Sequence, residues 1–384
     1  KQPDLNWENP KVRQEVYKMM NWWFERGIAG FRIDAIINIK KKLPFCDYEP
    51  DRDDGMVSIV RMLEDAEGIG EFLEEMKHET FDKYDAFTVG EVFNEKDSEL
   101  REFIGEDGHF SSKFDFAPEM CGKGGAWYEH ENVTPEMYKN AIFDSQLRVA
   151  DIGFLSNIIE NHDEPRGVCR YIPEGDLNDT SKKALAAVYF FLRGIPFIYQ
   201  GQEIGMENCP FESIDQLDDI SSKDEYKVCR DAGYSEKESM KLLRVYSREN
   251  ARTPVQWSDE EHAGFSTHEP WMIVNPNYRE INLAKQKDDR NSVYAFYKKM
   301  IALYKDPAYH ETLAFGRFEP YMRETKNLIA YYRKGERQTL LVLANFQNEA
   351  QTVMLPEAAG NVILNNCASV DLDDDGRITL GGYQ

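Results

Sequence analysis

Three acidic residues occupy equivalent places in this 384-residue sequence, each at the end of an apolar segment. They are Asp34, Glu91 and Asp163. Three carboxyl groups at one site suit the cleavage of a glycosidic bond. One attacks the anomeric carbon, a second protonates the leaving oxygen, and a third stabilises the positive charge that develops on the sugar. The residue types therefore favour glycoside hydrolysis, provided that the fold brings the acids together.

The apolar segments predict the strands that position these acids. Residues 28–34, 86–91 and 153–163 each resemble a short buried strand with polar residues at its C-terminal end. In a parallel (β/α) barrel every strand ends at the same face, so the three acids would meet there. The alternative is that Asp34 and Glu91 merely cap the helices that follow their strands.

Helices and strands alternate over the first 300 residues at lengths suited to parallel βαβ units. Asn9 and Pro10 predict the start of the first helix, and Gly27 its end. The predicted helices are residues 11–26, 58–80, 135–150, 181–192 and 291–304. Two further strands are predicted at residues 112–116 and 195–199.

The pattern then changes, which predicts a domain boundary. Residues 1–305 form the barrel region, interrupted at about 209–274 by a polar, acidic insertion. Residues 306–384 alternate with a period of two and predict a C-terminal antiparallel β domain. Its predicted strands are residues 313–318, 328–333, 339–345, 351–355 and 361–365. The fold class is therefore α/β.

Charge and hydropathy exclude several classes of protein. The 69 acidic residues outnumber the 46 basic ones, which gives a net charge of −23. Such an excess repels the phosphates of nucleic acids and the surface of anionic membranes. No run approaches 18 uninterrupted apolar residues, which excludes a transmembrane protein.

Cysteine usage indicates a reducing compartment. The six cysteines include no CxxC pair and are too sparse for a disulfide scaffold or a zinc site. We therefore expect reduced, mostly buried thiols and a cytoplasmic protein. No nucleotide-binding or zinc-hydrolase motif is present, and we expect no cofactor.

Two other patterns have ordinary structural explanations. Asp371, Asp373, Asp375 and Gly376 match the first half of an EF-hand loop, but Gly382 stands where the loop needs Glu, so we predict a hairpin turn. The aromatic runs at 22–23 and 189–191 fall on predicted helices and favour core packing over sugar binding.

Three motifs identify a family. The sequences GFRIDAI at 30–36, FTVGE at 87–91 and NHDEPR at 161–166 resemble motifs of the α-amylase superfamily of glycoside hydrolases, in the same order. Residues 2–10 and 247–257 resemble its oligo-1,6-glucosidase/α-glucosidase branch. The resemblance extends over essentially the whole chain and implies a (β/α)8 TIM barrel followed by the β domain.

The resemblance also implies roles for the acids. Asp34 matches the nucleophile that forms a covalent glucosyl-enzyme, Glu91 matches the general acid/base, and Asp163 matches the third carboxylate. Arg32 would lie against Asp34 and keep it ionised.

Two further residues are implied in substrate binding. His162 matches a hydrogen-bond donor to the bound glucose. Arg252 resembles an arginine of the insertion that closes the pocket, with Arg248 as a rival for that role.

The family barrel begins with three strand–helix units that do not match this chain, which opens just before the fourth strand. We therefore expect a partial barrel, completed by a missing N-terminal part of the same enzyme and inactive without it. The calcium loop of the family lies in that part, so no metal ligand is expected in this chain.

The resulting interpretation is a retaining α-glucosidase that removes terminal non-reducing glucose from short oligosaccharides. Ala35, a small residue after the predicted nucleophile, favours maltose-type α-1,4 substrates over the α-1,6 linkage. The alternative is an oligo-1,6-glucosidase acting on isomaltose or α-limit dextrins. Trehalose-phosphate hydrolases and sucrose isomerases share the motifs, and a non-enzymatic sugar-binding relative is the candidate from another class.

Overall fold

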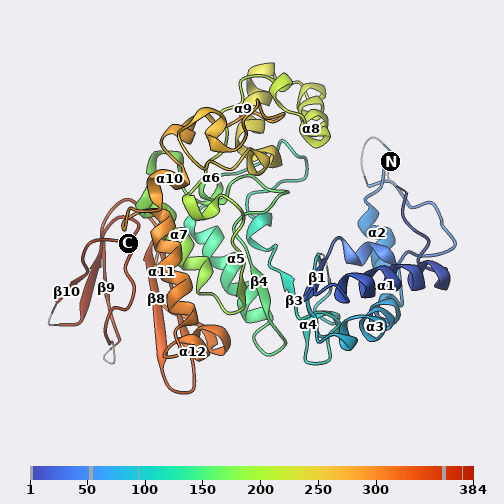
Figure 1. Cartoon of the computed structure of the whole chain (residues 1–384), viewed down its shortest axis with the longest axis horizontal. Helices are drawn as coiled ribbons and strands as arrows, with labels where there is room; N and C mark the ends of the chain where they lie inside the picture. The colour runs from blue at the N-terminus through green and yellow to red at the C-terminus, as the bar shows by residue number, and fades with distance from the viewer. Residues whose placement is uncertain (1–2, 52–54, 94, 357–359, 374) are drawn as a thin grey trace. The chain divides into compact units, whose positions relative to one another are not determined.

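The computed structural model describes residues 3–51, 55–93, 95–356, 360–373 and 375–384. The chain divides into two compact units (Figure 1). Unit 1 comprises residues 1–115 and 149–156, and unit 2 comprises residues 116–148 and 157–384. Each unit has a hydrophobic core of its own.

Unit 1 is built on parallel strands that follow one another along the chain. They are β1 (Gly30–Ile33), β2 (Phe87–Gly90), β3 (Ser112–Phe114) and the first two residues of β4 (Leu155–Asn157). Each strand pairs in parallel with the next one. The strands predicted at 28–34, 86–91, 112–116 and 153–163 are confirmed, although each is shorter than predicted.

Among the described residues of unit 1, α1 (Pro10–Phe24) precedes β1. Helices α2 (Ile59–Glu64) and α3 (Ile69–Glu79) lie between β1 and β2, and α4 (Leu100–Ile104) lies between β2 and β3. Helix α1 begins as predicted, because the Asn9 side chain accepts a hydrogen bond from the Lys11 N–H. The single helix predicted over 58–80 is wrong. Gly68, with a φ of +84°, separates α2 from α3, since this left-handed backbone cannot continue a helix.

The core of unit 1 holds β1 and β2 close together. Buried residues of α1 and α3 pack in it with Phe110 and Leu155. Gly30 is required at the strand contact, because a Cβ atom there would lie 1.7 Å from the Phe87 carbonyl oxygen. The prediction that Trp22 and Trp23 belong to the core is wrong: they are 44% and 42% exposed.

Strand β5 (Ile195–Pro196) of unit 2 follows β4 in the order of the five-stranded sheet. The backbone N–H of Phe197, next to β5, donates to the carbonyl of Asn157, the last residue of β4. The strand predicted at 195–199 is therefore present but shorter. The α-helices of unit 2 are α5 (Pro135–Arg148), α6 (Gly167–Tyr171), α7 (Asp179–Phe190), α8 (Ile220–Asp231), α9 (Glu236–Tyr246), α10 (Leu283–Gln286), α11 (Val293–Lys305) and α12 (His310–Phe315).

The polar insertion contains α8 and α9 and a small core of its own, which includes Cys209, Phe211, Leu217, Met240 and Leu243. Helix α8 begins at Asp219, whose side chain accepts a hydrogen bond from the Ser221 N–H. Helix α9 begins with a capping box between Ser235 and Glu238. These caps fix where both helices start.

The C-terminal region is antiparallel, as predicted, and its strands form two sheets. One has the order β6 (Arg317–Pro320), β7 (Leu328–Lys334), β8 (Thr339–Asn345), and the other has the order β10 (Asp371–Leu372), β11 (Arg377–Leu380), β9 (Gln351–Met354). Two predicted strands differ from the structure: residues 313–315 belong to α12, so the strand predicted at 313–318 begins only at Arg317, and residues 361–365 form no strand. Strands β10 and β11 pair as a hairpin, as predicted for the Asp-rich turn, although Asp374 lies outside the described residues.

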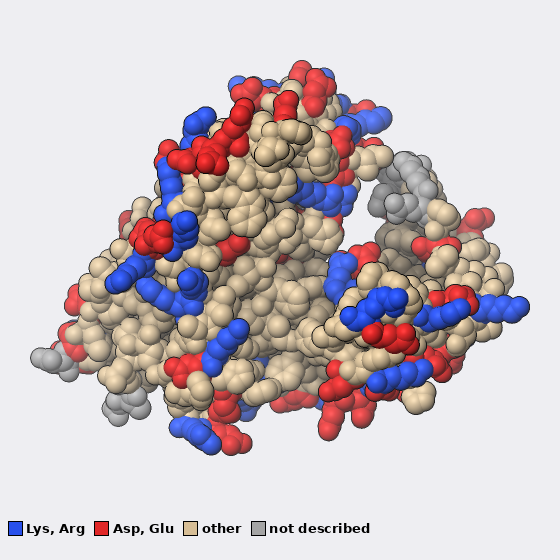
Figure 2. All heavy atoms as spheres, in the orientation of Figure 1, with Lys and Arg blue, Asp and Glu red and all other residues tan. Residues whose placement is uncertain are grey.

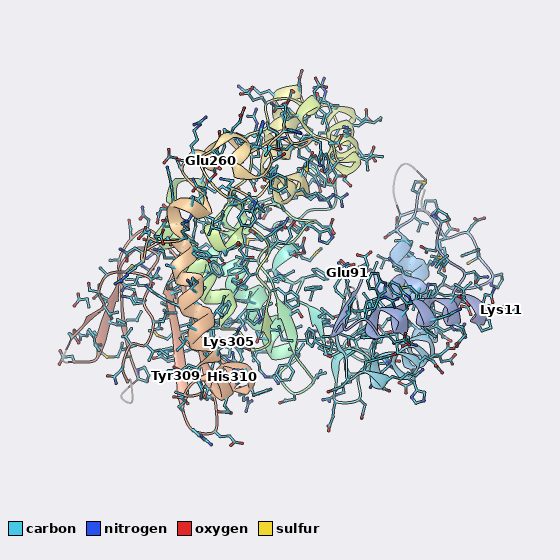
Figure 3. All side chains as sticks on the ribbon, in the orientation of Figure 1. Lys11, Glu91, Glu260, Lys305, Tyr309 and His310 are labelled. Carbon is cyan, nitrogen blue, oxygen red and sulfur yellow. The ribbon has the colours of Figure 1, made fainter. Side chains whose placement is uncertain are left out.

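The main core of unit 2 joins helices and strands. Residues of α5, α7, α11, β6 and β7 pack into one cluster, and Figure 1 shows α7 and α11 side by side. Tyr189, Phe190 and Phe191 are buried in this cluster, as predicted. The Tyr331 hydroxyl of β7 donates to the Val188 carbonyl of α7 at 2.7 Å. Near the end of this helical layer, Lys305, Tyr309 and His310 mark the turn from α11 into α12 (Figure 3).

Surface charge, cysteine burial and helix length can be compared with what the sequence predicted. On the face shown in Figure 2, Lys and Arg are interspersed with Asp and Glu and form no continuous basic patch. All six cysteines are free, but only Cys209 and Cys229 are buried, so the expectation of mostly buried thiols is wrong. Within the described ranges, no helix combines the length and the apolar character needed to cross a membrane.

Candidate active site

The first part of the site is a pair of acids at the ends of β1 and β2. Ile33 pairs with Gly90, and the Glu91 N–H donates to the Ile33 carbonyl at 3.0 Å. Asp34 and Glu91 therefore follow paired positions of neighbouring parallel strands. Figure 3 labels Glu91 at the end of β2.

Arg32 joins the two carboxylates. Its guanidinium contacts Asp34, as predicted, and its Nη2 also lies 2.8 Å from Glu91 Oε1. The second contact is one that sequence reasoning missed. A single cation thus lies between two acids, which offsets their mutual repulsion and fixes their spacing.

The two acids differ in environment. The side chain of Asp34 is 75% exposed, whereas that of Glu91 is 15% exposed. Burial raises the pKa of Glu91 above its usual value, even though the Ala35 N–H and Arg32 favour the ionised form. Such a pair suits acid–base chemistry, because one carboxyl group is biased toward the protonated state and the other is accessible.

The backbone of Ala35 makes a contact in the site that sequence reasoning missed, since the sequence singled out only the small side chain of this residue. Its N–H donates to Glu91 Oε2 at 2.6 Å. This geometry needs a left-handed backbone at Ala35, with φ of +39° and ψ of +40°. A non-glycine residue in this region carries strain, and such strain clusters at functional sites.

The third acid lies in the loop after β4, in unit 2. Asn161 shapes this loop, because its Oδ1 accepts from the Asp163 N–H at 2.7 Å. Its Nδ2 donates to Glu119 at 2.8 Å. The ring of His162 lies 3.0 Å from Asp163 Oδ2.

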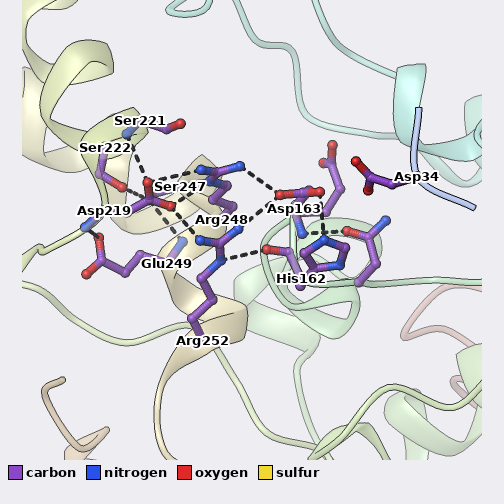
Figure 4. A network of polar contacts seen from close by, with 12 residues as sticks. Asp34, His162, Asp163, Asp219, Ser221, Ser222, Ser247, Arg248, Glu249 and Arg252 are labelled. Atoms are coloured by element: carbon purple, nitrogen blue, oxygen red, sulfur yellow. Dashed lines mark hydrogen bonds and ion pairs between the residues drawn. The ribbon is translucent and has the colours of Figure 1, made fainter. Parts of the chain in front are cut away.

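Two arginines of the insertion hold Asp163 from the other side (Figure 4). Arg248 donates to Asp163 Oδ1 at 2.7 Å and Arg252 donates to the same oxygen at 3.0 Å. Arg252 also donates to the His162 carbonyl at 2.8 Å. The sequence presented Arg248 and Arg252 as rivals, but the structure uses both. Both arginines also pair with a second carboxylate, Asp219, which sequence reasoning missed.

A buried ion pair supports the same loop from within. Arg166, the last residue of the NHDEPR motif, is fully buried and donates to Glu160 at 3.0 Å and to the Gln200 carbonyl at 2.8 Å. Glu160 in turn accepts from the Gly167 N–H at 2.7 Å. Breaking such a pair leaves an uncompensated buried charge, so Arg166 fixes the loop that carries Asp163.

The predicted site residues therefore form two groups. Unit 1 brings together Arg32, Asp34 and Glu91. Unit 2 brings together His162, Asp163 and Arg252. Across the described residues, no cluster of three or more His, Cys, Asp or Glu side chains has the geometry to hold a metal ion.

Glu225 on α8 is a partly buried carboxyl group near the arginine pair. Burial raises its pKa to about 8, and Asp219, Glu164 and Asp224 act in the same direction, while Arg248 opposes them. Its Oε2 is buried without a hydrogen-bond partner. This environment favours the protonated, neutral carboxyl group at neutral pH.

A pH dependence of stability follows from Glu225. Between pH 5 and 8 the native chain retains a proton that the unfolded chain has released, so the free energy of unfolding falls as pH rises. We expect Glu225 to contribute a loss on the order of 1–2 kcal/mol over this range, after allowance for its partial exposure. Urea denaturation at pH 5 and pH 8 measures it.

The variant Glu225→Gln removes the titration and should flatten this dependence. The matched control is Glu260→Gln, the same change at an exposed residue of the insertion, which should keep the wild-type slope. Equal slopes for all three proteins would contradict the assignment to Glu225.

Most of the chain matches models of known protein families. Residues 1–312 match the family described as "Alpha amylase, catalytic domain". Residues 328–384 match "Alpha-amylase SusG C-terminal domain". The first match includes both groups of site residues, and the second covers most of the C-terminal sheets.

Curated relatives agree. The chain is 39% identical to the probable oligo-1,6-glucosidase 3 of Bacillus subtilis, covering 95% of this chain and 66% of that protein. It is 38% identical to the oligo-1,6-glucosidase of Bacillus cereus, covering 93% and 64%. The chain thus spans about two thirds of the length of these relatives.

Solved structures show the same fold. The trehalose-6-phosphate hydrolase of Bacillus licheniformis is 34% identical, with a TM-score of 0.89 over 99% of this chain and 68% of that one. The trehalulose synthase of Pseudomonas mesoacidophila MX-45 is 30% identical, with a TM-score of 0.89 over 100% and 69%. With its paired strand-end acids and its C-terminal sheets, the chain belongs to the α-amylase family of glycoside hydrolases.

Proposed function

We propose that this chain carries the catalytic residues of a retaining α-glucosidase that acts on short α-glucosides. The observation that carries the proposal is the Arg32 bridge between Asp34 and Glu91. It places an exposed carboxylate next to a partly buried carboxyl group of raised pKa. Retaining hydrolysis needs this combination, a nucleophile and a proton donor.

In this mechanism Asp34 attacks the anomeric carbon, and the C–O bond to the leaving sugar breaks. Glu91 gives its proton to the departing oxygen and becomes a carboxylate. Glu91 then takes a proton from water, and the resulting hydroxide displaces Asp34 from the sugar. The Ala35 N–H stabilises Glu91 in its ionised form between the two steps.

Asp163 acts as the third carboxylate in this proposal. With His162 and Arg252 it would hold the hydroxyl groups of the terminal glucose. Like Asp34 and Glu91, Asp163 follows a strand of the parallel series, and this is where a (β/α) barrel carries its site residues. Within unit 2, hydrogen bonds to Asn161, Arg248 and Arg252 hold Asp163 and its loop in place.

Two observations point to different preferences for the glucosidic bond that is cleaved. Relatives named as oligo-1,6-glucosidases favour the α-1,6 bond, as in isomaltose and α-limit dextrins. Ala35 favours maltose-type α-1,4 substrates, because its methyl side chain leaves room for the next sugar. One small side chain changes discrimination by only about 1–3 kcal/mol. We therefore place isomaltose-type substrates first and maltose-type substrates second.

We also propose that further strands complete the barrel beside β1. Among the described residues, β1 pairs only with β2. Apolar side chains of the helix and linker that precede this strand are exposed, namely Met19, Trp22 and Trp23 of α1, and Ile28. An open strand edge with an apolar surface is a site for pairing. On this proposal residues 1–305 are the catalytic part and residues 306–384 the β domain.

The experiment uses an active enzyme that contains these 384 residues. Initial rates on isomaltose and maltose are compared. Proton NMR on an aryl α-glucoside, which releases glucose only from the attacked carbon, follows which anomer appears first. The proposal expects hydrolysis of both disaccharides with isomaltose faster, and release of α-glucose first from the aryl glucoside. Faster hydrolysis of maltose would favour the second substrate class, and initial release of β-glucose would overturn the retaining mechanism.

A further inference from the structure

Asp219 is the second carboxylate bound by the arginine pair, and it lies in the insertion rather than in the NHDEPR motif. Arg248 donates to it from Nε at 2.6 Å and from Nη2 at 3.0 Å. Arg252 donates from Nη1 at 2.9 Å. Each arginine therefore spans two carboxylates, Asp219 and Asp163 (Figure 4).

The two carboxylates differ in how firmly they are held. Asp219 is 7% exposed and Asp163 is 41% exposed. Asp219 caps α8 through the Ser221 N–H at 2.9 Å, and its own N–H donates to Glu249 at 3.2 Å. Asp219 is thus the fixed end of the network, and Asp163 is the accessible end.

Asp219 carries a negative charge in this setting. Burial alone would raise its pKa, but hydrogen bonds from Arg248 and the Ser221 N–H lower it below the usual value. Two cations consequently share two anions. Without the charge of Asp219, Asp163 would be the one carboxylate in the described part of the chain that pairs with both arginines.

We propose that Asp219 is a positioning residue for glycoside hydrolysis. Its fixed charge aligns Arg248 and Arg252, and through them it sets the position of Asp163. Both arginines donate hydrogen bonds to Asp163 Oδ1. Stronger hydrogen bonds from the arginines to that oxygen would compete with its hydrogen bonds to sugar hydroxyl groups. This inference rests on the proposed function, in which Asp163 binds the substrate.

Two substitutions at this one position separate charge from helix capping. Asparagine caps a helix about as well as aspartate, so Asp219→Asn keeps the cap and removes the charge. Glutamate is not among the preferred capping residues, so Asp219→Glu keeps the charge and weakens the cap. A purely structural role and a positioning role therefore predict opposite rankings of the two variants.

The readouts are kcat and KM on isomaltose, glucose binding by calorimetry, and Tm. We expect Asp219→Asn to lower kcat/KM by about 100-fold and to weaken glucose binding, because misplacing a substrate contact by about 1 Å has an effect of that size. We expect Asp219→Glu to lose less than about 10-fold in kcat/KM, since its charge is kept. Asp218→Asn is the matched control, with the same loss of charge at an exposed neighbour, and should behave like wild type.

Asp163→Asn separates this inference from the proposed function. If Asp163→Asn hydrolyses isomaltose normally, the proposed role of Asp163 is wrong and the role of Asp219 with it. If Asp163→Asn is inactive while Asp219→Asn matches Asp218→Asn, only the positioning role is overturned. The same holds if Asp219→Glu loses more activity than Asp219→Asn, because activity would then follow the cap rather than the charge.

Discussion

Replacement of Asp34 with asparagine is expected to lower kcat on an α-glucoside by about 10⁴-fold or more, because a neutral amide is a poor nucleophile. The fold should persist. The Asp34 side chain is largely exposed, and we expect the free energy of unfolding to change by less than about 1 kcal/mol. Steady-state rates and urea denaturation measure the two effects separately.

The control for Asp34 is Asp82→Asn, the same change at an exposed residue of unit 1 whose carboxylate lies 3.7 Å from the ring of His78. It should keep wild-type rates. Near-normal turnover by Asp34→Asn would remove this residue from the nucleophile's role, and a large loss of stability would show that the variant tests folding rather than chemistry.

Replacement of Glu91 with glutamine is expected to act according to the leaving group. Isomaltose needs a proton on its departing oxygen, so its kcat should fall by about 10² to 10⁴-fold. An aryl α-glucoside with an acidic phenol needs no such proton and should lose much less in the first step. Equal losses on the two substrates would contradict the assignment of Glu91 as the acid.

The pH profile gives a second test of Glu91. The first step requires the protonated carboxyl group, so kcat/KM on isomaltose should fall as pH rises through the pKa of Glu91. Because burial raises that pKa, the fall should lie at a higher pH than for an ordinary glutamate. Glutamine cannot ionise, so this alkaline limb should disappear from the profile of Glu91→Gln.

The sequence predicted those parts of the site that depend on strand ends. Asp34, Glu91 and Asp163 follow short apolar strands, and a parallel fold places polar residues there. Helix starts were also predictable where a local signal exists, as for Asn9 before α1. In both cases neighbouring residues determine the outcome.

Other features depend on contacts between residues distant in sequence. Asp219 resembles any helix cap, and only the fold shows its contacts with two arginines about thirty residues later. The Ala35 N–H has no sequence signal, because a backbone donor is the same in every residue but proline. Residues 361–365 alternate like a strand, yet they pair with no other strand in the part of the chain that the structure describes, since period-two patterns do not select a partner.

The most direct measurement of the central claim is to trap the covalent intermediate. An active enzyme that contains this chain is treated with a fluorinated α-glucosyl fluoride, digested with trypsin and analysed by mass spectrometry. Trypsin cleaves after Arg32 and Lys40, so the peptide of residues 33–40 contains Asp34 as its only side-chain carboxylate. The proposed mechanism predicts one glucosyl label on this peptide. A label on the peptide that contains Glu91 or on the one that contains Asp163, with residues 33–40 unmodified, would contradict it.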